Sequence, residues 1–501
     1  MVFSSYLFIF LFLPLALAVY FASPQKLRNA SLAVVSYVFY GWTNPWFVLL
    51  MFSTTLVDFN SGRMIGKHPD KKRWFLVFSL IFDLGILGYF KYFNFGIENF
   101  NALVSAMGIP EWQYAGFFRV LLPLGISFYT FQSLSYVIDV YRGTAEPVHS
   151  FVDYACYVSM FPQLVAGPII RFTEVANQLQ TRTHSWEKFA RGIAFFMLGV
   201  GKKVLIANPC GKIADCSFAA IDLPLPDAWL GMFSYAFQIY FDFSGYSDMA
   251  IGLGLLLGFT FPKNFDSPYR SHNIPEYWQR WHISLSSWLK DYLFYSLLRT
   301  SWCQKLTMNL SLAGRKKLSR ILPTTIALLI LWFAVGLWHG ASWTFVVFGL
   351  YHGFFVILDV ITTEIKGKKK SKDNAAESET VSPWKRLIKP MPIITTFIIA
   401  CFGHVLFRAD SLADAGHYFA SLFGFPCKDP TSGSVIRVLL QNPYYAGIMV
   451  LSAVIIWTMP QVWDFTKKLT VPKMVWCFIV FLLAILALSV QSYNPFIYFI
   501  F

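Results

Sequence analysis

Charged residues are scarce in this sequence. Lys, Arg, Asp and Glu make up 14% of its 501 residues, whereas hydrophobic residues make up 56% and aromatic residues 19%. A soluble globular protein carries about 25% charged residues. Long uncharged runs recur along the whole chain, which indicates a polytopic helical membrane protein rather than a soluble one.

Paired cysteines and the short motifs of several enzyme classes are also missing. The seven cysteines are dispersed and include no Cys-x-x-Cys pair, so neither a zinc site nor a disulfide framework is indicated, and no metal ligands are predicted. There is no Gly-x-x-x-x-Gly-Lys-Ser/Thr loop, no His-Glu-x-x-His and no Gly-x-Ser-x-Gly. These absences disfavour an ATP-driven pump, a zinc protease and a serine hydrolase.

Acidic residues are fewer than basic ones, and the net charge is +14. The basic residues fall in short connections between apolar runs, as membrane orientation requires, so nucleic-acid binding is discounted. The N-terminus has no basic region before its first apolar run, which predicts a retained first span over Tyr6–Phe21 rather than a cleaved signal peptide.

The apolar runs predict an all-α membrane protein with about eleven spans plus re-entrant and interfacial helices. Ser31–Phe59 is interrupted by Asn44-Pro45, so it is either one bent helix or two short ones. Phe151–Leu164 and the Pro and Gly residues after it suggest a re-entrant or surface-lying piece. We expect one membrane domain over 1–501, in which 366–383 is a flexible cytoplasmic loop near anionic lipid.

A histidine lies in the middle of the apolar hairpin Ile321–Ile361. His339 stands in Gly336-Leu-Trp-His-Gly340, and basic segments on both sides predict that the hairpin starts and ends in the cytoplasm. An ionisable residue at membrane depth suggests a functional site. Gly336 and Gly340 would let another backbone approach beside the imidazole. The alternative is a neutral core histidine bonded to a carbonyl.

Two other apolar runs carry an unusual number of polar side chains. Val120–Val140 contains Gln132, and Ala228–Phe259 is interrupted by a run containing Asp242, Ser244 and Asp248. Polar side chains on a span should face the protein interior or a wet cavity, so these four residues are candidates for lining a substrate cavity. The alternative is that they are hydrogen-bonding groups between helices.

A second histidine lies on an amphipathic stretch. Asn273 as a cap and Glu276 three residues later predict a helix from Pro275 to about Leu298. At 100° per residue His282 falls at the edge of its apolar stripe, beside Ser286. The helix could lie at the membrane interface with this histidine pointing inward, or it could be an ordinary amphipathic helix.

Several runs, taken together, resemble the membrane-bound O-acyltransferase (MBOAT) family, in its bacterial alginate O-acetylation branch. They are Met1-Val-Phe-Ser-Ser5, Leu122-Pro-Leu-Gly-Ile-Ser-Phe-Tyr-Thr-Phe-Gln132, Phe161-Pro-Gln-Leu-Val-Ala-Gly-Pro-Ile169, Gln238-Ile-Tyr-Phe-Asp-Phe-Ser-Gly-Tyr-Ser-Asp248, Tyr277-Trp-Gln-Arg-Trp-His-Ile-Ser-Leu-Ser-Ser-Trp288, Gly336-Leu-Trp-His-Gly340 and Phe407-Arg-Ala-Asp410. Each run is moderately specific, and their order along nearly the whole chain is strong.

The resemblance implies a funnel of tilted helices in a multi-pass protein of the bacterial inner membrane. It implies that His339 is the catalytic histidine and that His282 is a second catalytic-site histidine. Gln132, Asp242, Ser244 and Asp248, together with Trp281, Ser286 and Trp338 beside the two histidines, form the predicted substrate-binding set. A neutral imidazole in a dry pocket suits a general base for acyl transfer to a hydroxyl.

The resemblance further implies the substrates and partners. No cofactor is bound; acetyl-CoA or another acyl thioester is the cytoplasmic donor, and an extracytoplasmic polysaccharide is the acceptor, reached directly or through a partner acetyltransferase. Two alternatives use the same features: a transporter or flippase, or a non-catalytic scaffold of a polysaccharide export complex. The polymer, the acyl group, the partner, the oligomeric state and the role of His282 stay open.

Overall fold

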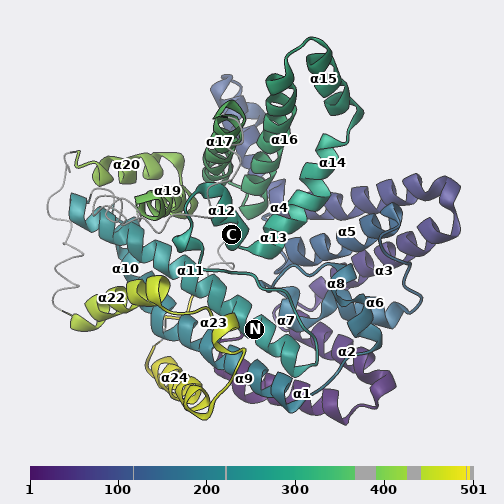
Figure 1. Ribbon diagram of the computed structural model, residues 1–501, viewed down its shortest axis with the longest axis vertical. Coiled ribbons are helices and arrows are strands. Elements are labelled where there is room, and N and C mark those ends of the chain that lie inside the picture. The colour runs from purple at the N-terminus through teal and green to yellow at the C-terminus, as the bar shows by residue number, and fades with distance from the viewer. Residues whose placement is uncertain are drawn as a thin grey trace, which may run out of the picture. The chain divides into compact units, whose positions relative to one another are not determined.

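The computed structural model describes residues 1–114, 116, 118–220, 223–366, 391–425, 442–491 and 493–496. Within these ranges the regular structure is helical and contains no β-strand (Figure 1), which confirms the all-α prediction. The chain forms two compact units. The first unit comprises Met1–Asn208, Tyr240–Lys263 and Val462–Phe501, and the second comprises Pro209–Ile239 and Asn264–Gln461. The single membrane domain stays a prediction, and 367–383 of the expected cytoplasmic loop lie outside the described residues.

The first unit is built from the N-terminal helices and two segments from later in the chain. Its helices are α1 (Leu13–Ala22), α2 (Arg28–Gly41), α3 (Trp46–Lys67), α4 (Lys72–Ala106), α5 (Ile126–Arg142), α6 (Phe151–Ser159), α7 (Phe161–Leu164), α8 (Phe172–Gln180), α9 (Trp186–Gly201), the π-helical turn η5 (Lys202–Ala207), α23 (Val462–Phe465) and α24 (Val471–Val490). The long helix α11 (Leu225–Leu256) contributes its C-terminal half.

The second unit contains the N-terminal half of α11 and both histidine-bearing segments. Its helices are α10 (Asn208–Phe218), α12 (Ile274–Arg280), α13 (Ile283–Trp288), the π-helical turn η7 (Leu289–Phe294), α14 (Tyr295–Leu298), α15 (Ser301–Leu312), α16 (Lys316–His339), α17 (Trp343–Lys366), α19 (Met391–Arg408), α20 (Leu412–Leu422) and α22 (Pro443–Thr458).

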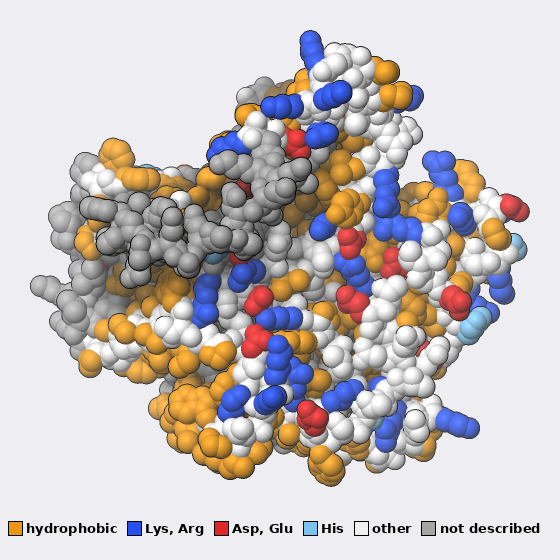
Figure 2. Space-filling model, in the orientation of Figure 1, with side chains coloured by type: hydrophobic (Ala, Val, Ile, Leu, Met, Phe, Trp, Pro, Cys, Tyr) orange, Lys and Arg blue, Asp and Glu red, His pale blue; other side chains and the backbone are white. Residues whose placement is uncertain are grey.

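Five helical segments of the described chain are long and apolar enough to cross a membrane: Pro69–Ala106, which contains α4, and α16, α17, α19 and α24. Leu7–Ala22 and Pro443–Thr458 are shorter apolar helices. Hydrophobic side chains cover the outer face of α24, where Trp476 and Leu486 are more than half exposed (Figure 2). Fewer helices qualify than the eleven expected crossings because others are short or polar: α5 has 17 residues, and α11 carries three aspartates. The protein is a multi-pass membrane protein.

Two helix breaks lie next to prolines in the predicted apolar runs. Asn44-Pro45 separates α2 from α3, so the two-helix alternative for Ser31–Phe59 is confirmed. Met160 separates α6 from α7, and Pro162 lies in the first turn of α7. Proline is tolerated there because the first backbone N–H groups of a helix have no intrahelical acceptor.

The continuous helix predicted from Pro275 to Leu298 is wrong. Asn273 does cap the start, accepting from the backbone N–H of Glu276, but α12 ends at Arg280. Trp281 is extended, and His282 has φ of +44°, in the left-handed region. A non-glycine residue held there by its surroundings interrupts a right-handed helix. Helical periodicity alone does not reveal such a break, because the apolar stripe continues on both sides of it.

Ion pairs join η5 to α11, which is one continuous helix through its polar run. Lys203 lies 2.8 Å from Asp242, and Lys202 lies 2.7 Å from Asp248. Lys203 also donates to the carbonyl of Pro495. The helices approach closely, since a Cβ on Gly199 would lie 2.6 Å from the carbonyl oxygen of Gly245 in α11. The two carboxylates therefore hold helices of the first unit together.

Helices α16 and α17 form the expected hairpin and lie side by side (Figure 1). A Cβ on Gly336 would lie 2.5 Å from the carbonyl oxygen of Phe345, and a Cβ on Gly349 would overlap the carbonyl oxygen of Trp332. A Cβ on Gly340 would overlap the ring of Phe345. The close backbone approach predicted beside His339 is therefore confirmed at Gly336, and its partner is the second helix of the same hairpin.

Replacing Gly349 by alanine should lower the free energy of unfolding by about 1–3 kcal/mol, because the methyl group must separate two backbones in contact. Unfolding in mixed detergent micelles measures this change. The matched control is Gly447→Ala in α22, where a Cβ meets nothing within 4 Å. That change should leave stability unchanged or raise it, since alanine favours helix. Equal effects would refute the close-approach argument.

Replacing Lys203 by methionine should cost about 3–5 kcal/mol of unfolding free energy, because it removes the buried cation that compensates the Asp242 carboxylate. The two side chains are only 3% and 1% exposed. The same unfolding assay applies. Arg320→Gln provides the control, because its pair with Glu364 is 3.6 Å long and Arg320 is 71% exposed, so at most about 1 kcal/mol should be lost. A comparable loss in both variants would contradict this expectation.

Candidate active site

His339 is the last residue of α16 and packs among aromatic rings from three helices. Its ring centroid lies 4.9 Å from Trp338, 5.4 Å from Phe348 of α17 and 5.0 Å from Phe407 of α19, each in an edge-to-face arrangement. The side chain is buried. Such packing surrounds the imidazole with apolar side chains.

The ring of Trp338 contacts both predicted histidines. It lies 4.9 Å from the ring of His339 and 5.8 Å from that of His282, edge-to-face with each. These residues are 57 positions apart in the sequence, yet one indole holds them in the same part of the second unit. The structure therefore brings together both residues predicted to be catalytic.

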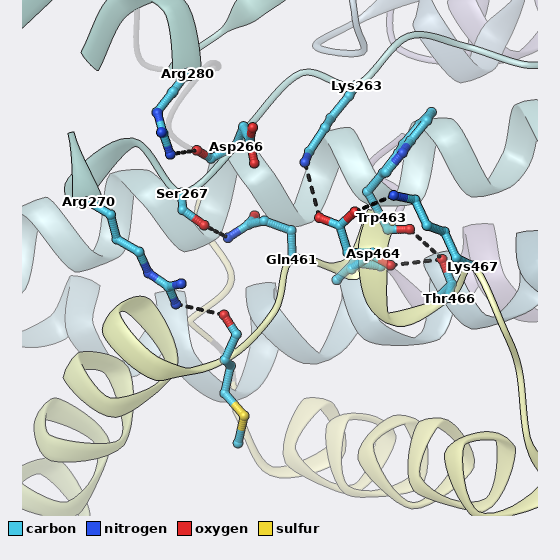
Figure 3. Close-up of polar contacts among 12 residues, drawn as sticks. Lys263, Asp266, Ser267, Arg270, Arg280, Gln461, Trp463, Asp464, Thr466 and Lys467 are labelled. Carbon is cyan, nitrogen blue, oxygen red and sulfur yellow. Dashed lines mark hydrogen bonds and ion pairs between the residues drawn. The ribbon is translucent and has the colours of Figure 1, made fainter. Parts of the chain in front are cut away.

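The backbone on both sides of His282 is hydrogen-bonded to the extended segment that precedes α12. The N–H of Ile283 donates to the carbonyl of Asn264, and the N–H of Asp266 donates to the carbonyl of Arg280, both at 2.9 Å. The Arg280 guanidinium also reaches the Asp266 carbonyl at 3.4 Å (Figure 3). These bonds support the left-handed conformation of His282, an energetically costly backbone state that tends to occur at functional sites.

The His282 side chain is fully buried and bonded through Nδ1, which lies 3.2 Å from Oδ1 of Asn264. Burial lowers the pKa of the imidazole to about 3. His282 is therefore uncharged at neutral pH, because removing a cation from water disfavours protonation.

Trp281 and Ser286, two other predicted site residues, belong to the same turn. The Trp281 ring stacks on Tyr277 at 5.7 Å and contacts Phe265 at 5.1 Å. The backbone N–H of Ser286 donates to the carbonyl of His282 at 3.0 Å. Trp281 thus packs with Tyr277 and Phe265, and Ser286 closes the first turn of α13.

Two further buried histidines lie beside this cluster, and the sequence analysis assigned them no role. His352 of α17 is 4.9 Å from Phe348, the ring that also contacts His339, and is 5.1 Å from Trp278. His404 of α19 lies with Nε2 3.3 Å from the hydroxyl of Tyr277. Each stands in an apolar helix, so the signal that singled out His339 could have found them. Among the described residues no group of three or more His, Cys, Asp or Glu is placed to hold a metal ion.

The other predicted substrate-binding residues belong to the first unit. Asp242 and Asp248 make the ion pairs with Lys203 and Lys202, which fits the alternative that they join helices. The side chains of Gln132 and Ser244 are buried, and their polar atoms have no hydrogen-bond partner among the described residues. Substrate binding by these four residues stays a prediction.

The cluster suits proton transfer in a dry environment. Two imidazoles flank one indole, and burial keeps His282 uncharged. A neutral imidazole can accept a proton from a hydroxyl, and its ordinary pKa lies close enough to neutrality for it to release that proton again.

Comparison with known proteins identifies the family. The model of the membrane-bound O-acyltransferase family matches residues 144–365, a range that contains His282 and His339. The probable alginate O-acetylase AlgI of Azotobacter vinelandii is 41% identical over 429 residues, which cover 85% of this chain and 78% of that protein. This chain belongs to the membrane-bound O-acyltransferase family. The protein is accordingly an O-acyltransferase.

Another relative is similar over the full chain, and a further one is named for a different substrate. The probable alginate O-acetylase AlgI of Pseudomonas putida is 37% identical over an alignment that covers 100% of both chains. The peptidoglycan O-acetyltransferase of Helicobacter pylori is 34% identical over 70% of this chain and 69% of its own. Both are similar to the present O-acyltransferase well beyond the segment that holds the two histidines.

His352 and His404 should respond differently to replacement by leucine. His404→Leu removes the partner of the buried Tyr277 hydroxyl and should lower the free energy of unfolding by about 1–3 kcal/mol. His352→Leu should change it by less than about 1 kcal/mol, because neither ring nitrogen has a hydrogen-bond partner within the described ranges. Unfolding of both variants in mixed micelles decides this, and a larger loss for His352→Leu would show that its imidazole is bonded.

Proposed function

We propose that this O-acyltransferase moves a short acyl group, acetyl, from a cytoplasmic thioester such as acetyl-CoA to hydroxyl groups of an extracytoplasmic polysaccharide. The names of its relatives, which concern alginate and peptidoglycan, support a polysaccharide acceptor. The location is the bacterial inner membrane. The transfer reaches the polymer directly or through a separate extracytoplasmic acetyltransferase.

The observation that carries the proposal is the position of His339. It stands at the end of an apolar helix long enough to cross a membrane, buried against three aromatic rings and sharing Trp338 with His282. Placing a titratable ring at such a position costs free energy, so its presence there suggests a function. General-base catalysis, which uses an uncharged imidazole, is such a function.

The reaction follows from ordinary acyl-transfer chemistry. His339 takes the proton of the acceptor hydroxyl as the hydroxyl oxygen attacks the thioester carbonyl carbon. The tetrahedral intermediate then collapses, breaking the carbon–sulfur bond and expelling the thiolate. The imidazolium returns the proton to the thiolate, so the products are an ester and a free thiol, and His339 is neutral again.

The other predicted site residues have supporting roles in this proposal. His282 orients the acceptor or stabilises the developing oxyanion. Gln132, Asp242, Ser244 and Asp248, with Trp281, Ser286 and Trp338, contact the substrates. The donor thioester is a substrate, and no bound cofactor or metal ion is required by this chemistry.

His339→Gln should abolish acetylation of the polymer while the protein stays folded and inserted. Glutamine retains hydrogen-bonding capacity but cannot act as a base near neutral pH, so we expect a loss of at least about 10²-fold in the initial rate. Incorporation of label from radiolabelled acetyl-CoA, measured in membranes that contain the acceptor polymer, provides the readout.

His417→Gln is the matched control, because His417 is an exposed histidine on α20 and should leave the rate unchanged. A transporter or flippase would show loss of export in the His339 variant without acetyl transfer by the original protein. A scaffold would tolerate His339→Gln. Acetylation retained by that variant would refute the assignment of His339 as the base.

A further inference from the structure

Three polar groups converge on one oxygen beside His282. Oδ1 of Asn264 accepts from the hydroxyl of Ser284 at 2.9 Å and from the backbone N–H of Ser284 at 3.2 Å, and it lies 3.2 Å from Nδ1 of His282. All three side chains are buried. The amide nitrogen of Asn264 has no hydrogen-bond partner in the described part of the chain. The carboxamide is therefore held through its oxygen.

This arrangement fixes which end of the carboxamide faces His282. A backbone N–H can only donate, so the Asn264 atom that it meets must be the oxygen. Because that same oxygen faces Nδ1, the His282 ring carries its hydrogen on Nδ1. In a neutral imidazole the other nitrogen, Nε2, is then the hydrogen-bond acceptor.

The surroundings of His282 favour this neutral form. The charged side chains on the adjoining α12 are Glu276 and Arg280, which pair with each other at 2.7 Å. Asp266 lies in the segment that precedes α12, and its backbone carbonyl accepts a hydrogen bond from Arg280. His339 contacts the Trp338 ring, which also contacts His282. Burial lowers the pKa of His282 to about 3, which agrees with an uncharged ring.

The tautomer of His282 decides between its two possible roles, which are orienting the acyl acceptor and stabilising the oxyanion. Stabilising an oxyanion requires a donor, whereas a neutral ring with its hydrogen on Nδ1 offers only an acceptor at Nε2. We propose that Asn264 is a positioning residue that holds His282 in the Nδ1–H tautomer, so that Nε2 accepts a hydrogen bond from an O–H group of the acyl acceptor. This inference rests on the proposed function, and it assigns His282 to acceptor binding rather than to oxyanion stabilisation.

The test uses Asn264→Asp in the full-length protein in its native membranes. One carboxylate oxygen can accept the same three hydrogen bonds, but the negative charge stabilises the His282 cation, whose Nε2 carries a hydrogen and cannot accept. The pKa of His282 should therefore rise. We expect that pKa, followed in solid-state NMR by the pH dependence of the ¹⁵N shifts of the His282 ring, to move upward by about 1–3 pH units.

Ser284→Ala is the matched control. It removes a hydroxyl that lies 2.9 Å from Oδ1 of Asn264 and 3.4 Å from Nδ1 of His282, but it adds no charge and leaves Asn264 against His282. The pKa of His282 should therefore move by less than about one pH unit. If Asn264 only holds the turn together, both variants should lower stability without moving the pKa of His282. An unmoved His282 pKa in Asn264→Asp would overturn the proposal.

A second measurement does not depend on acyl transfer or on the folding of Asn264→Asp. Solid-state NMR of the ¹⁵N-histidine-labelled original protein at pH 7, with the His282 signals assigned by their loss in His282→Gln, reports which ring nitrogen is protonated. Protonation at Nδ1 supports the proposal, and protonation at Nε2 overturns it. Because His339→Gln tests the base separately, failure of the general function and failure of the Asn264 assignment are distinguishable.

Discussion

The close approach of α16 and α17 at Gly336 and Gly349 determines the arrangement of the site. Because the two backbones touch there, Phe348 of α17 lies against His339 at the end of α16, and His352 lies one turn further along on the same face. Larger residues at the glycines would separate the helices and open the aromatic packing around the imidazole. The helix contact and the placement of His339 are therefore one structural feature.

The two units bury different kinds of polar side chain. In the first unit, Lys203 with Asp242 and Lys202 with Asp248 place opposite charges together, so each ion compensates the cost of burying the other. In the second unit, the buried titratable groups around Trp338 are histidines, which can lose their charge and keep a nitrogen lone pair. A neutral imidazole can lie in an apolar site and still act as a base, which a buried ion pair does not provide.

The segment around His282 shows how a local break in a helix creates a site. An unbroken helix from Pro275 to Leu298 would have placed His282 at the edge of its apolar stripe. Instead, the left-handed backbone at His282 and the hydrogen bonds accepted by Asn264 place the imidazole inside the protein, against Trp338. The hydrogen bonds of Asn264 with His282 and with Ser284 offset the energetic cost of that conformation.

The sequence by itself determined the helical membrane class, the break at Asn44-Pro45 and the α16–α17 hairpin, and it singled out His339 as a candidate, because composition, proline and an isolated histidine act locally. The similarity of several motifs to one family also pointed to His282. Only the tertiary structure decided that Asp242 and Asp248 pair with lysines, that α12 ends before His282, and that His352, His404 and Asn264 adjoin the site. These features depend on contacts between residues far apart in the chain, which local periodicity does not encode.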